Sequence, residues 1–104
     1  MILDLSVFQP ETLDITMMDA TQLHIPKPDQ GMVIELIRFR SIKEDTNAKR
    51  AIRALNDMTE LILNSNTDGI SIQRRPIEQM SVEIQLAIVN AYTQFILKLQ
   101  ANPT

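Results

Sequence analysis

The sequence contains no cysteine and no tryptophan, and its 104 residues include only two glycines and 4% aromatic residues. The absence of cysteine excludes disulfides, thiol chemistry and zinc sites with thiolate ligands. The glycines, Gly31 and Gly69, are too few for a glycine-rich loop that cradles phosphates. The scarcity of aromatic side chains leaves no stacking platform for single-stranded nucleic acid. Several classes of enzyme and of nucleic-acid-binding protein are thereby excluded.

A net positive charge and long hydrophobic runs are also missing. The formal net charge is −3 at pH 7, whereas nucleic-acid-binding proteins usually carry a basic surface that neutralises phosphates. No segment approaches the roughly 18 uninterrupted apolar residues that predict a membrane span. Residues 1–4 (MILD) lack the basic start of a signal peptide. We therefore expect a soluble, cytosolic protein that binds neither nucleic acid nor membranes.

No group of side chains in the sequence predicts catalysis. His24 is the only histidine and has no second ligand or catalytic partner at a recognisable spacing. We expect it to be an ordinary surface or edge residue, with a pH-sensing role as the alternative. Paired carboxylates such as Glu44 and Asp45 are better explained as solvated helix ends, because an acid–base pair needs a pocket that perturbs its pKa values. We predict no enzymatic activity, no cofactor and no metal site.

Residues 1–28 are predicted to form an N-terminal arm and a β-hairpin. Residues 1–11 suggest a short strand or an extended arm that stops at Pro10. Beyond them, apolar and polar residues alternate with the period of two that is typical of half-buried strands. The apolar positions are Leu13, Ile15 and Met17, followed after a turn at residues 18–21 by Leu23 and Ile25. An isolated two-stranded hairpin is unstable in water, so we expect it to pack on helices.

Residues 29–104 are predicted to be mainly helical. Residues 29–42 favour a helix with Asp29 as its cap and most of its circumference buried, with a buried strand as the alternative. The next helix begins after a cap at Asp45 or Thr46 and places Asn56 on its wet side. Its apolar face consists of Ala48, Ala51, Ile52, Leu55, Met58, Leu61 and Ile62.

Residues 67–80 are predicted to form a connector that Ile70, Ile72 and Ile77 anchor, with a short helical turn after Pro76 as an alternative. A last helix follows at about residues 82–101, and Ser81 caps it. Arg74 and Arg75 form a basic spot in this connector, interpreted as a solubilising turn or as a contact for an acidic partner. The predicted fold is α+β, a single domain over residues 1–104. A small N-terminal β-hairpin packs on about three α-helices, the last two of which are long and amphipathic.

The last helix carries more apolar residues than one buried face requires. Its predicted core face consists of Ile84, Ile88, Ala91, Tyr92, Phe95, Ile96 and Leu99. Val82, Leu86 and Leu97 form a second stripe, which either lies under the hairpin or the N-terminal arm or is an exposed interaction site. Met17 and Met18 stand at the end of the hairpin, where thioethers suit adaptable contacts. These five residues are our candidates for partner binding.

Four segments carry a resemblance that covers nearly the whole chain: LSVFQPETLDITM, LHIPKP, RALNDMTELILNSN and MSVEIQLAIVNAYTQFILKLQANP. In order and character they resemble the tail assembly chaperones of tailed phages and prophages of Firmicutes, which are encoded near the tail genes. That family has no catalytic motif to match, so the resemblance assigns no binding residue in this chain.

The resemblance implies a non-enzymatic protein of the host cytoplasm that self-associates. Such chaperones bind the long, largely helical tape measure protein, keep it soluble and help to recruit tail tube subunits. The expected mode of contact is a helix docked in an apolar groove. The alternatives are a structural virion component, such as a tail-completion or connector protein, and a small regulatory partner-binding module.

Overall fold

The alternating N-terminal pattern folds into an antiparallel hairpin in the computed structural model, which describes residues 1–5, 11–43 and 47–101. Strand β1 (Thr12–Thr16) pairs with β2 (Gln22–Pro26). Leu13 lies opposite Ile25 and Ile15 lies opposite Leu23, so the four apolar side chains share one face. The two β2 residues are completely buried. The predicted hairpin is confirmed.

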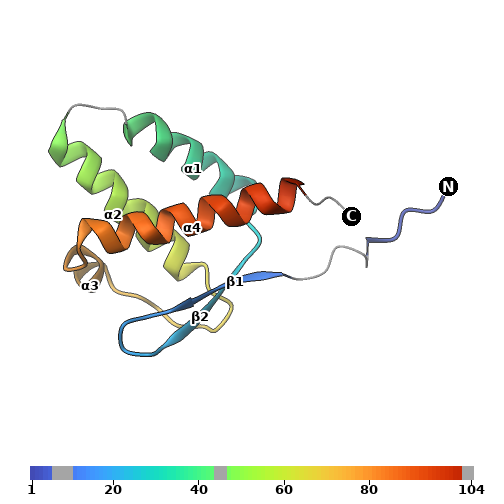
Figure 1. The fold of residues 1–104 in the computed structure, drawn as a ribbon, viewed down its shortest axis with the longest axis horizontal. Helices are drawn as coiled ribbons and strands as arrows, with labels where there is room; N and C mark the ends of the chain where they lie inside the picture. The colour runs from blue at the N-terminus through green and yellow to red at the C-terminus, as the bar shows by residue number, and fades with distance from the viewer. Residues whose placement is uncertain (6–10, 44–46, 102–104) are drawn as a thin grey trace.

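The arm that precedes the hairpin forms no strand within residues 1–5, and residues 6–10 lie outside the described part. Leu3 and Leu5 are exposed, and Figure 1 shows the first residues running away from the helices. Neither the hairpin face nor the last helix is covered by these five residues.

Helix α1 (Gln30–Lys43) confirms the helical interpretation of its segment. Asp29 Oδ1 accepts a hydrogen bond of 2.9 Å from the amide of Met32, which satisfies a free amide of the first turn. Leu36 and Phe39 are buried, but Ile34 and Ile37 are 54% and 61% exposed. The expectation of a largely buried helix is therefore wrong, because α1 packs on α2 along one side only.

Helix α2 (Ala48–Asn64) is the central element. The side chain of Asn47 caps it by accepting from the amide of Arg50 at 3.2 Å; the predicted caps lie outside the described residues. Asn56, predicted to be solvated, is buried, whereas Ile52 and Leu61 of the predicted apolar face are exposed. These assignments were wrong because α1, α3, α4 and β2 all contact α2. The buried surface of α2 is therefore broader than the predicted apolar face, and it includes Asn56 but neither Ile52 nor Leu61.

A short helix, α3 (Arg74–Glu78), lies in the connector and begins two residues before Pro76, whereas the helical turn that the sequence allowed was expected to follow that proline. Pro76 occupies its first turn, where its missing amide hydrogen costs no helical hydrogen bond. Arg74 Nη1 lies 2.7 Å from Asp57 Oδ1 of α2, and Glu60 and Glu78 lie within 3.7 Å of its guanidinium. Arg74 thus pairs with carboxylates of its own chain, and the pairs with Asp57 and Glu60 hold α3 against α2.

Helix α4 (Val82–Ala101) begins where it was predicted, and Ser81 Oγ accepts from the amide of Ile84 at 3.1 Å. Its buried side chains are Gln85, Ile88, Val89, Tyr92, Phe95 and Ile96. Ala91, predicted for the core face, is exposed, and the side chain of Leu99 lies outside the described part. Gln85 is buried because its Nε2 donates to the carbonyls of Ile77 and Met80, both at 3.2 Å.

The core collects buried side chains from β2 and from all four helices. In Figure 1, α4 crosses α2, with α1 towards the top of the view and the hairpin towards the bottom. The arrangement is α+β, as predicted, with α3 as an additional short helix. The hollows at its surface include one beside the hairpin, one between α1 and α4 and a smaller one between α1 and α2.

Candidate functional site

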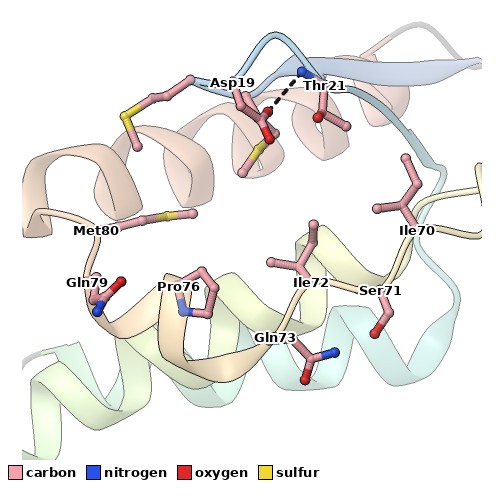
Figure 2. A pocket seen from close by; sticks show the side chains of 11 residues that line it. Asp19, Thr21, Ile70, Ser71, Ile72, Gln73, Pro76, Gln79 and Met80 are labelled. Atoms are coloured by element: carbon pink, nitrogen blue, oxygen red, sulfur yellow. Dashed lines mark hydrogen bonds between the residues drawn. The ribbon is translucent and has the colours of Figure 1, made fainter.

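A groove of about 560 Å³ opens between the end of the hairpin and α3 (Figure 2). Its apolar lining consists of Met17, Met18, Ile70, Ile72, Pro76 and Met80, and its polar lining of Asp19, Thr21, Ser71, Gln73 and Gln79. We call this surface the methionine groove. Its volume falls within the range of about 300–1,000 Å³ that is usual for ligand pockets.

The hairpin turn forms one wall of the methionine groove. The amide of Met17 donates to the carbonyl of Thr21 at 2.8 Å, and the amide of Ala20 donates to the carbonyl of Met17 at 2.9 Å. Asp19 Oδ1 accepts from the amide of Thr21 at 3.0 Å, and hydrogen bonding with Thr21 lowers the pKa of Asp19. The turn thereby holds Met17 half-buried and Met18 77% exposed at the groove.

Two asparagines position the opposite wall. Asn66 Oδ1 accepts from the amide of Ile70 at 3.1 Å, and its Nδ2 donates to the carbonyl of Ile70 at 2.7 Å. Asn64 binds Ile72 in the same way, with a bond of 2.7 Å from the amide and one of 3.0 Å to the carbonyl. Each asparagine thus satisfies both backbone groups of one isoleucine, as a neighbouring strand would. This wall is fixed although it contains no strand.

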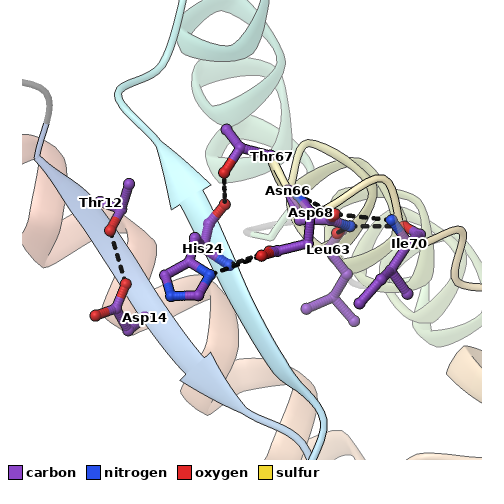
Figure 3. Close-up of polar contacts among 8 residues, drawn as sticks. All are labelled: Thr12, Asp14, His24, Leu63, Asn66, Thr67, Asp68 and Ile70. Carbon is purple, nitrogen blue, oxygen red and sulfur yellow. Dashed lines mark hydrogen bonds and ion pairs between the residues drawn. The ribbon is translucent and has the colours of Figure 1, made fainter.

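His24 ties the same connector to the outer edge of β2 (Figure 3). Its amide donates to Asp68 Oδ2 at 2.7 Å, and its Nδ1 lies 2.8 Å from Asp68 Oδ1. The amide of Thr67 donates to the carbonyl of His24 at 2.9 Å. The hydrogen bond with Asp68, together with its charge, raises the pKa of His24. His24 therefore connects β2 to the connector. It lies at the edge of the hairpin, as predicted, but it also makes these contacts, which were not predicted.

The chemistry of the groove suits apolar contacts. Among the described residues, Asp19 is the single charged one that lines it, and the other polar side chains are neutral amides and hydroxyls. Three methionines provide flexible, polarizable side chains that adapt to different apolar partners. Within the described ranges no three His, Cys, Asp or Glu side chains form a group that could hold a metal ion.

The structure separates the five predicted partner-binding residues. Met17 and Met18 line the methionine groove, and Leu86 is half-buried against the core. Val82 and Leu97 are 48% and 47% exposed, so neither the hairpin nor residues 1–5 cover them. These two lie fifteen positions apart on α4, or about 22 Å at 1.5 Å per residue. Of the predicted stripe, Val82 and Leu97 are therefore exposed, and Leu86 between them is partly buried.

Sequence reasoning missed four apolar residues of the groove: Ile70, Ile72, Pro76 and Met80. Ile70 and Ile72 were expected only to anchor the connector. The sequence does contain a hint of their position, namely the alternating apolar residues Ile70 and Ile72 a few positions after Asn64 and Asn66. Asparagine side chains readily bind backbone groups of nearby residues, so these two asparagines could have been expected to hold that segment. Met80 lies 63 positions after Met17 in the printed sequence, so no local pattern brings the two together.

Comparisons with protein-family models, curated proteins and solved structures found no match. Among the helices of the described residues, none combines the length and the hydropathy that crossing a membrane requires.

Proposed function

We propose that this protein is a phage tail assembly chaperone that binds the tape measure protein through the methionine groove. The observation that carries the proposal is an open, methionine-rich apolar groove on a small acidic domain. The resemblance of the sequence to tail assembly chaperones supplies the identity of the partner. The proposed function is non-enzymatic and is carried out in the host cytoplasm.

An amphipathic helix of the partner exposes an apolar stripe to water until that stripe is buried. Burying one large apolar side chain of that stripe contributes about 1.5–3 kcal/mol. The groove offers about 560 Å³ of space beside six apolar residues, enough to receive several such side chains. Met18 stands at its edge with 77% of its surface free, so it can close over an inserted side chain. Methionine also tolerates the varied apolar positions of a long repetitive helix.

Recruitment of tail tube subunits and self-association belong to the same proposal, on the basis of the resemblance alone. The formal charge of −3 supports a chaperone role, because like charge keeps a protein with exposed apolar surface from aggregating.

Co-expression with a tape measure protein of a tailed phage or prophage of Firmicutes tests the proposal. We expect the soluble fraction of the tape measure protein to rise severalfold, and Met18→Lys to abolish most of that gain. The exposure of Met18 makes the substitution compatible with folding. Ile52→Lys is the matched control, because Ile52 is 49% exposed and lines none of the described grooves. An unchanged soluble fraction with the wild-type protein would contradict the proposal.

Mass spectrometry of purified virions distinguishes a chaperone from a structural component. We expect the protein to be present in infected cells during tail assembly and absent from finished particles. A fixed stoichiometry in the particle would instead favour a tail-completion or connector protein.

A further inference from the structure

A second apolar surface lies between α1 and α4, away from the methionine groove. It is a hollow of about 170 Å³ lined by Val33, Leu36, Ile37, Arg40, Thr93, Ile96 and Leu97. We call it the α1–α4 groove. It shares no residue with the methionine groove. Val82, which begins α4 two residues after Met80 of the methionine groove, lies fifteen positions before Leu97 of the α1–α4 groove, or about 22 Å at 1.5 Å per residue.

The α1–α4 groove has the form of an incomplete helical bundle. Both α1 and α4 pack on α2, and Leu36 and Ile96 form a buried floor between them. The rims are apolar but uncovered, since Ile37 is 61% and Leu97 is 47% exposed. Helices pack at axial distances of about 8–10 Å by placing ridges of side chains into such grooves. A fourth helix laid here would bury both rims against a floor that is already in place.

The charge at this groove selects among possible occupants. Among the described residues, Arg40 is the one charged side chain that lines this groove, and no carboxylate lines it. Within the part of the chain that the structure describes, Arg40 has no ion pair, whereas the neighbouring Arg38 is paired with Glu35 at 3.2 Å. A symmetric contact between two copies would bring both Arg40 guanidinium groups to the interface without a lining carboxylate. An acidic partner would instead neutralise this charge.

We infer that the α1–α4 groove docks an amphipathic helix of another protein, one that carries carboxylates beside its apolar stripe. The apolar positions of that helix, three and four residues apart, lie over Ile37 and Leu97. A carboxylate on the border of the stripe pairs with Arg40. This inference does not depend on the identity of the partner of the methionine groove.

Two matched synthetic helices test the inference. They share one apolar stripe at positions i, i+3, i+4 and i+7 over 18 residues and differ only in having glutamate or lysine beside it. We expect fluorescence anisotropy to show that the glutamate peptide binds about threefold to tenfold more tightly than the lysine peptide. Arg40→Glu should reverse that preference, and Ile37→Lys should abolish binding of both peptides. The exposure of these two side chains keeps the variants folded, which circular dichroism checks.

Nuclear magnetic resonance of the isotope-labelled protein locates the bound peptide. Shifts of the amides around Ile37, Thr93 and Leu97 are expected, and Met18→Lys should leave the affinity unchanged. The inference is overturned if neither peptide binds, if both bind equally, or if the shifts cluster at the methionine groove. It is also overturned if Ile37→Lys halves the molar mass in sedimentation, because the groove would then be an interface between two copies of this chain.

Discussion

His24 and Asp68 connect segments 44 positions apart, with His24 Nδ1 at 2.8 Å from Asp68 Oδ1. Hydrogen bonding to Asp68 raises the pKa of His24 above its ordinary value of 6.5. The hydrogen bonds from His24 lower the pKa of Asp68 below its ordinary value of 3.8. The lone histidine therefore acts as one half of a tether between β2 and the wall of the methionine groove.

This pair predicts a pH dependence of stability with a defined sign. A raised histidine pKa contributes stability that is fully present below pH 6.5 and lost as the pH rises through the folded-state pKa. The lowered pKa of Asp68 contributes stability above pH 3.8 that is lost as the pH falls through its folded-state pKa. We therefore expect the urea concentration at the midpoint of unfolding to decrease as the pH rises from about 6 to about 8.

The His24→Gln variant isolates this contribution, because the chain has no other histidine. We expect its urea midpoint to be less dependent on pH over the same interval, and Asp68→Asn to behave alike. Added salt should weaken the dependence in the wild type, since both side chains are partly exposed. An identical pH profile for wild type and His24→Gln would contradict the assignment.

The elements themselves follow from local patterns in the sequence. A period of two predicted β1 and β2, and helical periodicity with capping residues predicted α2 and α4. The faces of the helices were predicted less well. Asn56 and Gln85 are buried in contacts that only tertiary neighbours create, and Ile34 and Ile37 of α1 lack such neighbours. The periodicity of a sequence does not predict how many other elements will pack on a helix.

The turn of the hairpin contains a residue other than glycine with a positive φ angle. Ala20 has φ of +72°, a left-handed conformation that glycine adopts without a Cβ penalty. We expect Ala20→Gly to stabilise the protein by about 0.5–1 kcal/mol, measured by urea denaturation. As a control, Ala54→Gly within α2 should destabilise it by about 1 kcal/mol. Destabilisation of similar size by both substitutions would show that the turn gains nothing from glycine.

At the scale of the whole molecule, α2 joins the parts. It contacts α1, α3, α4 and β2, and Ile62 on it is completely buried. Both grooves depend on this packing, because the walls of each come from elements that contact α2. The Arg74 ion pairs with α2 further hold α3 in place beside the methionine groove.

Ile62→Ala therefore tests the centre of the fold. Removal of a buried isoleucine side chain should destabilise the protein by about 2–5 kcal/mol through lost burial and a residual cavity. That is a large fraction of the roughly 5–15 kcal/mol typical of a folded domain. The exposed Ile52→Ala should change the free energy of unfolding by no more than about 0.5 kcal/mol. Equal effects of the two substitutions in urea denaturation would show that α2 is not central.

The hairpin, the long helices, their order and the α+β class could be predicted from local patterns, because periodicity and capping act over a few neighbouring residues. Missing residue types also excluded chemistries such as those that need cysteine. The buried side of each helix and the apolar surface that remains depend instead on tertiary packing. The methionine groove joins Met17 to Met80, and the α1–α4 groove joins Ile37 to Leu97. Such contacts arise from the packing of whole elements on α2, which no local pattern contains.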